Sequence, residues 1–420
     1  MPSDRAEIGR HGSESRRVKR STSEWIVRGV LTLGVASIAY VSVAGTLANV
    51  IVEVDANAAD ALAIVDGRIM AASAAQKFAA SPNSSSTSAQ AKLARKALLR
   101  DPTAVDALSV LAFQAQMRSD EKLTDRLFSY SVALSRREFG PQMWRIEKDV
   151  SLGDVDGALR NYDLALRTSD KARQMLFPVL ASSTVEPEIR ERLIRMLERK
   201  PAWDQAFIHF SANSGSDPTA VAQLFRESEG KGLPVEMADQ ARLVTRLVTR
   251  GLMDEAWDYY QTFRSAVARN HSRDPEFNSG VENPTPFDWN IGTMPGLSAA
   301  ILRQGSDGFL DFALPPSTRA TVVKQTQLLP PGDYRLEGRI EGVDQPERSR
   351  PYWVLSCLDG TELVRVDLPG SSQVGATFSG RFSVPADCAV QSLSLVARAS
   401  DEIEGVTGRV ENVQIVPVGG

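Results

Sequence analysis

The sequence has few of the side chains on which catalysis, metal binding and cofactor binding depend. Its 420 residues include two cysteines and three histidines. The histidines, His11, His209 and His271, have no neighbour at the spacing of metal ligands. The sequence contains no Gly-x-Ser-x-Gly motif, no phosphate-binding loop and no dinucleotide fingerprint. It therefore predicts a protein that is not an enzyme and that holds neither a metal nor a cofactor.

The chain also lacks a strong charge of either sign. Its formal net charge is -4, so we expect no nucleic-acid partner. Asp307 and Asp311 could form a catalytic carboxylate pair, but solvated acids on a strand are the more common explanation. The loop with Asp401, Glu402 and Glu404 could bind calcium, and here a solvated turn is again more common.

One long stretch has no charge at all. Residues 29–52 (GVLTLGVASIAYVSVAGTLANVIV) would cross a hydrocarbon layer of about 30 Å as a helix, at about 1.5 Å of rise per residue. Trp25 precedes it as an interfacial anchor. The residues before it include several basic ones: Arg5, Arg10, Arg16, Arg17, Lys19, Arg20 and Arg28. We therefore predict a single-pass anchor in a bacterial inner membrane, with residues 1–28 as a disordered cytoplasmic tail and the bulk of the chain outside.

Two alternatives to an anchor exist for this stretch. A cleaved signal peptide would fit the small residues around Thr46-Leu47-Ala48, but the apolar run is longer than a usual signal core. A buried helix of a soluble protein would rarely be apolar on every side over such a length.

The next part of the chain has the period of α-helices. Residues 53–88 predict a helix, either a first repeat helix or a stalk, followed by a Ser-rich linker. Residues 89–269 predict successive helices with short Asp, Pro or Gly breaks. An Ala-Leu pair recurs at residues 97–98, 133–134 and 165–166, at intervals of 36 and 32 residues. The offsets of Gly153, Ala158 and Tyr162 recur unchanged at Gly251, Ala256 and Tyr260.

This pattern resembles the tetratricopeptide repeat (TPR) family, whose repeats are about 34 residues long. The resemblance implies that Ala158 and Ala165 let two helices approach and that Tyr162 fills the gap between them, with Ala256 and Tyr260 as later counterparts. It also implies a solenoid whose concave surface binds a protein partner. An irregular all-α domain is the alternative.

Beyond a polar linker at residues 270–283, the period of the sequence changes to that of β-strands. In residues 333–341 apolar and charged residues alternate, and Asp359-Gly360 joins two strands as a hairpin. Further strands are expected at residues 308–314, 318–328, 352–358, 363–368, 376–384, 391–398 and 409–416. Short strands with Gly and Pro turns predict an all-β jelly-roll sandwich over residues 284–420.

A second resemblance is carried by the sandwich. Phe277-Asn278 leading to Trp289, residues 329–334 (LPPGDY) and residues 408–413 (GRVENV) look like the galactose-binding-like jelly rolls, a group that includes many carbohydrate-binding modules. The resemblance implies a possible glycan ligand. The candidate contacts are Trp289, Arg335, Arg339 and Tyr352, with Tyr352 expected to point to the same side as the two arginines of a nearby strand. A solvated sheet face is the alternative for these strand residues, and Trp289 could equally plug the end of the sandwich.

The two cysteines, Cys357 and Cys388, both lie near predicted strand ends of the sandwich. An exported domain with two cysteines is typical of one disulfide, and buried free thiols are the alternative.

Together, these patterns predict a transmembrane helix, an all-α TPR-like solenoid and a C-terminal β-sandwich. The expected function is a non-enzymatic envelope protein that binds a protein partner through its repeats and polysaccharide through its sandwich, in the assembly or export of exopolysaccharide. A purely structural scaffold without glycan binding is the second hypothesis. A glycan-active enzyme is the third, which the absence of a catalytic constellation disfavours.

Overall fold

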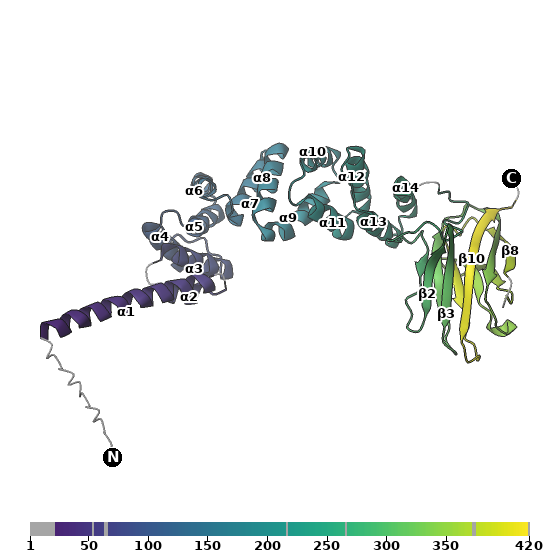
Figure 1. Cartoon of the computed structure of the whole chain (residues 1–420). Helices are drawn as coiled ribbons and strands as arrows, with labels where there is room; N and C mark the ends of the chain where they lie inside the picture. Colours follow the sequence, from purple (N-terminus) through teal and green to yellow (C-terminus); the bar gives the residue numbers. More distant parts are fainter. Residues whose placement is uncertain are drawn as a thin grey trace, which may run out of the picture. The chain divides into compact units, whose positions relative to one another are not determined.

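The computed structural model describes residues 22–52, 54–62, 66–215, 217–264, 267–371 and 375–418 (Figure 1). Of the tail predicted to be disordered, residues 1–28, the first 21 lie outside these residues. The prediction is wrong for residues 22–28, because they continue the apolar helix towards its N-terminus. The chain forms two compact units, Met1–Ser169 and Asp170–Gly420, which are described separately.

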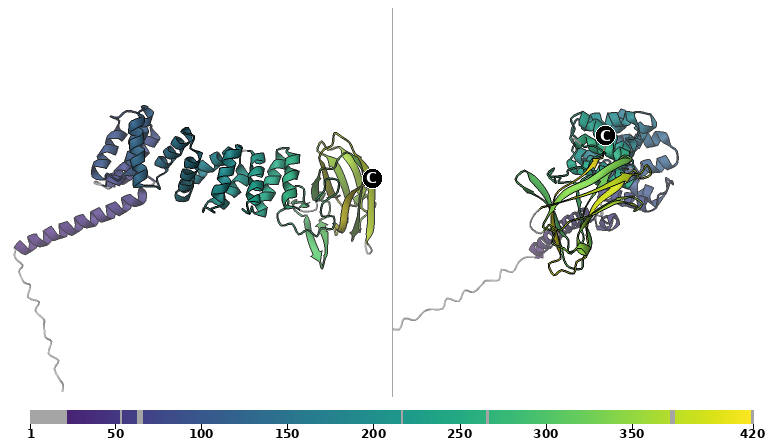
Figure 2. Two further views of the ribbon diagram at one scale, coloured as in Figure 1. Left: turned by 90° about the horizontal axis from the view of Figure 1, so that it is seen from above. Right: turned by 90° about the vertical axis from the view of Figure 1, so that its right-hand side faces the viewer.

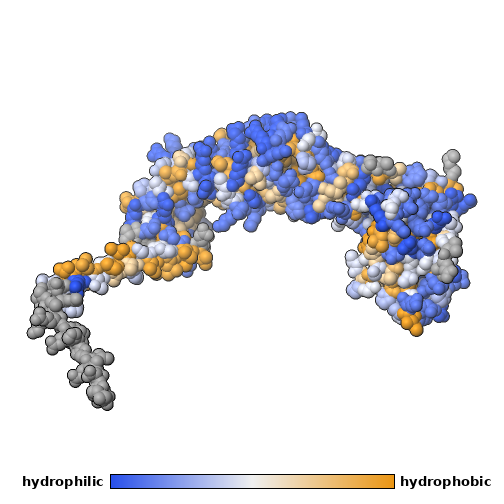
Figure 3. Space-filling model, viewed as in Figure 1, coloured by the Kyte–Doolittle hydropathy of each residue, from blue (hydrophilic) through white to orange (hydrophobic). Residues whose placement is uncertain are grey.

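The first unit begins with one long apolar helix, α1 (Thr22–Ile51). Within it, Trp25–Ile51 is long and apolar enough to span a membrane, a property that a signal sequence shares. Most of its large apolar side chains are exposed, as the orange surface of this helix in Figure 3 shows.

The C-terminal end of α1 packs against two short helices, α2 (Ala56–Leu62) and α3 (Gly67–Ala80). Ala48, Ala59 and Ile69 are fully or almost fully buried and form one apolar cluster. The segment predicted as a stalk is therefore part of the folded unit. The prediction of a stalk is wrong because the small alanines of these helices allow close packing, which the alanine content alone did not reveal.

Five further helices complete the described part of the first unit: α4 (Ala89–Arg100), α5 (Val105–Met117), α6 (Glu121–Leu134), α7 (Phe139–Ser151) and α8 (Val155–Thr168). Ser88, Asp120 and Asp154 each accept a backbone N–H at the start of a helix, which satisfies part of its unpaired first turn. The helices thus begin where the polar breaks of the sequence predicted.

The recurring Ala-Leu pairs lie near the ends of α4, α6 and α8, so the sequence period marks every second helix. Ala158, Tyr162 and Ala165 on α8 are buried, whereas Ala133 on α6 is exposed. The repeat is therefore imperfect, and its membership of the TPR family stays a prediction.

The second unit contains six α-helices among its described residues, which follow one another in antiparallel succession (Figure 2). They are α9 (Asp170–Ser183), α10 (Pro187–Leu197), α11 (Asp204–Ser214), α12 (Pro218–Gly230), α13 (Met237–Thr249) and α14 (Met253–Phe263). Ala256 and Tyr260 on α14 are buried.

The rest of the second unit is a sandwich of two five-stranded antiparallel sheets. Sheet A has the order β1 (Asn290–Ile291), β4 (Ala320–Gln327), β9 (Gln391–Ala397), β6 (Tyr352–Cys357), β7 (Glu362–Asp367). Sheet B has the order β2 (Ser298–Gln304), β3 (Asp307–Leu314), β10 (Val406–Pro417), β5 (Gly332–Glu341), β8 (Ala376–Val384). The predicted sandwich is confirmed, and Gly360 closes the β6–β7 hairpin with a positive φ of 90°.

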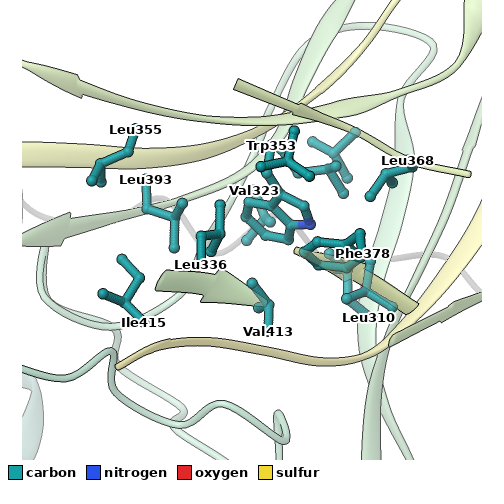
Figure 4. Close-up of a cluster of buried hydrophobic side chains, with 14 of the residues drawn as sticks. Leu310, Val323, Leu336, Trp353, Leu355, Leu368, Phe378, Leu393, Val413 and Ile415 are labelled. Carbon is teal, nitrogen blue, oxygen red and sulfur yellow. The ribbon is translucent and has the colours of Figure 1, made fainter. Parts of the chain in front are cut away.

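The core of the sandwich lies between the two sheets (Figure 4). Alternate residues of each strand supply it, such as Tyr334, Leu336 and Ile340 of β5, while Trp353 is fully buried near its centre. The side chains between these core residues form the outer face of each sheet.

The segment predicted as a linker is partly built into the sandwich. Ser272 and Ile415 exchange two hydrogen bonds, and the Val413 N–H donates to the Pro275 carbonyl at 2.9 Å. Phe277 lies in the core. A linker over residues 270–283 is therefore wrong for residues 272–277, because these polar residues hydrogen-bond the edge of β10.

Cys357 and Cys388 form a disulfide with Cα atoms 5.6 Å apart, as predicted. The bond connects the end of β6 to the turn before β9, two strands that also pair directly in sheet A.

The buried alanines of α8 provide a test of the helical packing. We expect Ala165→Trp to destabilise the protein by about 1–3 kcal/mol, because a large ring overpacks a site where the alanine is almost fully buried. Ala133→Trp is the matched control, since Ala133 belongs to the equivalent Ala-Leu pair but is exposed. Equal melting temperatures for the two variants would contradict the packing of α8.

Candidate functional site

The two outer sheet faces of the sandwich differ in how their charges are arranged. On sheet B, charged side chains pair with one another, both within β5 and between neighbouring strands. Arg335 Nε lies 2.5 Å from Glu337 Oε2, and Arg339 Nε lies 3.6 Å from Glu411 Oε2. Arg409 lies within 4.0 Å of both Asp311 and Glu341 (3.8 and 3.9 Å). Arg335 and Arg339, both candidate glycan contacts, are thus engaged in ion pairs on a solvated sheet face.

Tyr352 lies on the other sheet from these arginines. Its strand β6 belongs to sheet A, whereas Arg335 and Arg339 lie on β5 in sheet B. The prediction that Tyr352, Arg335 and Arg339 share one binding face is therefore wrong. The physical reason is that β5 and β6, although consecutive in the chain, pair with different partners: β5 with β8 and β10, and β6 with β7 and β9.

Trp289 is buried at 5% exposure and offers no ring face to a sugar. Its Nε1 donates to the Asp274 carbonyl at 2.8 Å, and its ring contacts Phe277 and Trp353. The structure corrects its predicted role from a glycan contact to a core residue.

The outer face of sheet A carries short hydroxyl side chains that the sequence analysis did not select. Thr326 on β4, Ser392 and Ser394 on β9, and Ser356 on β6 all point away from the core, between buried neighbours. The pairing register sets Thr326 opposite Ser392, and Ser392 opposite Ser356. We call these four residues the hydroxyl strip. The alternation of serine and leucine in residues 391–395 (QSLSL) was the sequence signal that could have indicated it.

Few hydrogen bonds engage the hydroxyls of the strip among the described residues. Ser392 Oγ and Ser394 Oγ lie 3.4 Å apart. The hydroxyls of Thr326 and Ser356 make no hydrogen bond to any residue that the structure describes. Because a serine or threonine hydroxyl is both a donor and an acceptor, the strip offers both kinds of partner.

A cluster of arginines surrounds Tyr352 at one end of the strip. The guanidinium carbons of Arg365 and Arg398 lie 4.6 and 4.4 Å from the centre of the Tyr352 ring. Arg319 Nη2 donates to the Tyr352 hydroxyl at 2.9 Å. Because Tyr352 is 3% exposed, its ring is covered by these arginines and is not a stacking surface. Sequence reasoning named Tyr352 but missed the three arginines.

The helix α14 is joined to the sandwich by a buried polar network. The Tyr260 hydroxyl donates to Asp288 Oδ1 at 2.7 Å, and Arg264 lies 3.8 Å from Asp288 Oδ2. Arg273 donates to the carbonyls of Phe287, at 2.7 Å, and of Thr326. Burial, followed by the Asp288 charge, raises the pKa of Tyr260, and burial lowers the pKa of Arg273 to about 10. Tyr260, predicted as a repeat-packing residue, thus also joins helix and sandwich.

The described residues contain no group of three or more histidine, cysteine, aspartate or glutamate side chains that could hold a metal ion. Asp311 faces Arg409 on sheet B, and Asp401 lies 3.5 Å from Arg348.

In the first unit, a cavity of about 370 Å³ lies among α3, α5 and the start of α7. Asp106 and Glu138 line it together with Arg68, Thr103 and Ser135. Burial raises the pKa of Asp106, and burial followed by the charge of Asp106 raises the pKa of Glu138. The two carboxylates are therefore held in a surrounding that disfavours their charged forms.

No protein-family model and no curated protein matches the chain. Its C-terminal region is similar to several solved carbohydrate-binding modules. One is TmCBM61 in complex with beta-1,4-galactotriose, at 15% identity over 36% of this chain and 100% of that chain, with a TM-score of 0.27. Another is the family 11 module from Clostridium thermocellum in complex with a beta-1,3-1,4-mixed-linked tetrasaccharide, at 11% identity over 36% and 98% of the two chains, with a TM-score of 0.24. A third is CBM6cm-2 from Cellvibrio mixtus lichenase 5A in complex with cellotriose, at 9% identity over 32% and 98%, with a TM-score of 0.21. At these scores, the assignment of the sandwich rests on the strand pairing described above.

The cavity carboxylates predict a dependence of stability on pH. The pKa of Glu138 is raised above 4.5 in the folded state, so the folded state binds its proton more tightly than the unfolded chain does. As the pH rises above 4.5 through the folded pKa, the native state loses stability. We therefore expect Glu138→Gln to raise the melting temperature at pH 7, and this gain to fade as the pH is lowered to about 4.5.

Glu147→Gln is the matched control for this measurement, because Glu147 lies on α7, the helix that Glu138 precedes, but is exposed. Thermal unfolding of both variants and the parent chain from pH 4 to 8 gives the comparison. A gain for Glu138→Gln that is independent of pH would contradict the raised pKa.

Proposed function

We propose that the sandwich binds glycan through the outer face of sheet A. The observation that carries the proposal is the hydroxyl strip, whose four short side chains project from neighbouring strands β4, β9 and β6. Short side chains allow a sugar ring to approach the sheet closely, and the hydroxyls can donate to and accept from the hydroxyls of the sugar.

The outer face of sheet B is the less suitable candidate. Its charged side chains already pair across β3, β10 and β5. A sugar that binds beside Arg339 or Arg409 would have to compete with these ion pairs. Several charged side chains of sheet B pair with one another, whereas the hydroxyls of Thr326 and Ser356 on sheet A have no partner among the described residues. We therefore favour sheet A as the glycan-binding face.

We further propose that α1 stays in the mature protein as a membrane anchor. The helix has two parts: the large apolar side chains of residues 25–43 are exposed, whereas Ala44 and Ala48 are buried against the first unit. At about 1.5 Å per residue, residues 25–43 extend about 28 Å, close to the thickness of the hydrocarbon layer.

The same packing argues against a signal peptide that is cleaved after Ala48. Ala48 is fully buried with Ala59 and Ile69, and Ile51 packs on the same cluster. Cleavage there would remove one side of this cluster and expose the apolar side chains of α2 and α3. Because the end of α1 is part of a folded apolar cluster, a helix retained in the mature protein explains this packing better than a cleaved signal peptide does.

We therefore propose that the chain is a membrane-anchored envelope protein, and we retain the prediction that it is not an enzyme. Its helices would bind a protein partner and its sandwich would bind polysaccharide, as in the assembly or export of exopolysaccharide, with the N-terminus in the cytoplasm. A structural scaffold whose sandwich binds no glycan is the alternative.

Replacing a central residue of the strip tests glycan binding. Ser394→Ile removes a hydroxyl and adds bulk, so we expect about tenfold weaker binding of the oligosaccharide that the intact chain selects from a panel of neutral and acidic oligosaccharides. The control is Ser379→Ile on β8, an exposed serine on the outer face of sheet B. Affinities can be measured by calorimetry with the full chain in detergent. Absence of binding across the panel would favour the scaffold.

The anchor is tested by the N-terminus and by the buried end of α1. We expect protein purified from membranes to retain α1, and Ala48→Asp to lower its melting temperature, because the new carboxylate is buried without a partner. Val50→Asp serves as the control, since Val50 is exposed on the same turn. A mature protein that begins at Asn49 would disprove the retained anchor.

A further inference from the structure

The hydroxyl strip is bordered mainly by basic side chains. Four cationic residues, Arg319, Lys324, Arg365 and Arg398, lie on or beside the outer face of sheet A, with two acidic ones, Glu362 and Asp367. One row across the four strands β4, β9, β6 and β7 runs from Lys324 through Ser394 and Val354 to Arg365. Since neighbouring strands are about 4.8 Å apart, Lys324 and Arg365 lie about 14 Å apart on the two sides of the strip.

The acidic residues neutralise only some of these cations. Arg365 donates twice to Glu362, at 3.0 and 2.6 Å, and Arg398 lies 2.6 Å from Asp367. Arg319 and Lys324 have no acidic partner among the residues that the structure describes. The face therefore carries two uncompensated positive charges close to the strip.

Arg319, at the end of the strip, is held in place through Tyr352. The Tyr352 ring contacts the guanidinium groups of Arg365 and Arg398, which are themselves restrained by their acidic partners. The Tyr352 hydroxyl is thus a fixed point, and it binds Arg319 at 2.9 Å. A guanidinium has five N–H donors, so Arg319 keeps donors free for a second, planar acceptor.

We propose that the glycan bound at the hydroxyl strip contains uronic acid units and that Arg319 binds their carboxylates. This inference rests on the proposed glycan binding by sheet A. A carboxylate is planar and accepts two parallel hydrogen bonds from a guanidinium, which a neutral sugar hydroxyl does not. Lys324 adds a second positive charge beside Ser394, suited to another acidic unit of the same polymer. Glu362 and Asp367 on the same border disfavour a densely charged polyphosphate such as nucleic acid.

Methyl esterification provides the test, because it removes the charge of a uronate while leaving the sugar chain the same. The probe is the hexamer of galacturonic acid, compared with its methyl ester, with the full chain in detergent. We expect the acid form to bind about tenfold more tightly at low salt, and this preference to shrink as salt is added. Arg319→Gln should reduce the preference to less than about threefold, and Arg319→Lys should give an intermediate value.

The matched control is Arg381→Gln, which removes an exposed arginine from the outer face of sheet B and should keep the full preference. An unchanged preference in Arg319→Gln, or an equal loss in Arg381→Gln, would overturn the role of Arg319. Equal binding of acid and ester would overturn the uronate class but leave glycan binding by sheet A intact. Equally tight binding of duplex DNA or a sulfated glycan would also overturn the uronate class, and would make that polyanion the ligand of the face. If neither hexamer nor any neutral oligosaccharide binds, the proposed function itself fails.

Discussion

The C-terminal half of the protein depends on one buried cation, the guanidinium of Arg273. It is buried between α14 and the sandwich. The central carbon of the guanidinium lies 5.2 Å from the centre of the Trp257 ring and 5.7 Å from the centre of the Phe287 ring. Removing a charge from water is costly, and it is tolerated here because two backbone carbonyls and two ring faces replace the solvent. Burial lowers its pKa to about 10, so the group stays charged at neutral pH.

The hydrogen bonds around Arg273 also extend to the outer face of sheet A. Arg273 donates to the carbonyl of Thr326, and the Thr326 N–H donates to the Pro286 carbonyl at 2.8 Å. The hydroxyl of the same residue belongs to the hydroxyl strip. The backbone of β4 that presents one edge of the strip is therefore held by the segment that connects helix and sandwich, which couples the position of the helices in this unit to the geometry of the face.

Much of the fold could be predicted from local patterns, whereas the site could not. The alternation in residues 333–341 is repeated in the burial of β5, and the disulfide follows from the two cysteines and their place near strand ends. Grouping Tyr352 with Arg335 failed because pairing between strands is set by distant segments: β5 pairs with β10, more than 60 residues later in the chain. Trp289 was placed wrongly because its hydrogen-bond partner, Asp274, lies in a segment whose composition is that of a linker.

Whether an arginine is available to a ligand is likewise a property of the topology and not of the residue. Arg339 is paired with Glu411 and Arg409 with Asp311, each through strands far apart in the sequence. Arg319 is preceded by a proline-rich turn and followed by β4, with nothing in its local sequence to distinguish it from these. It differs because the strand order of sheet A places it beside a tyrosine hydroxyl and not beside a carboxylate. A count of basic residues thus says little about anion binding, whereas the strand order decides which of them keep their charge uncompensated.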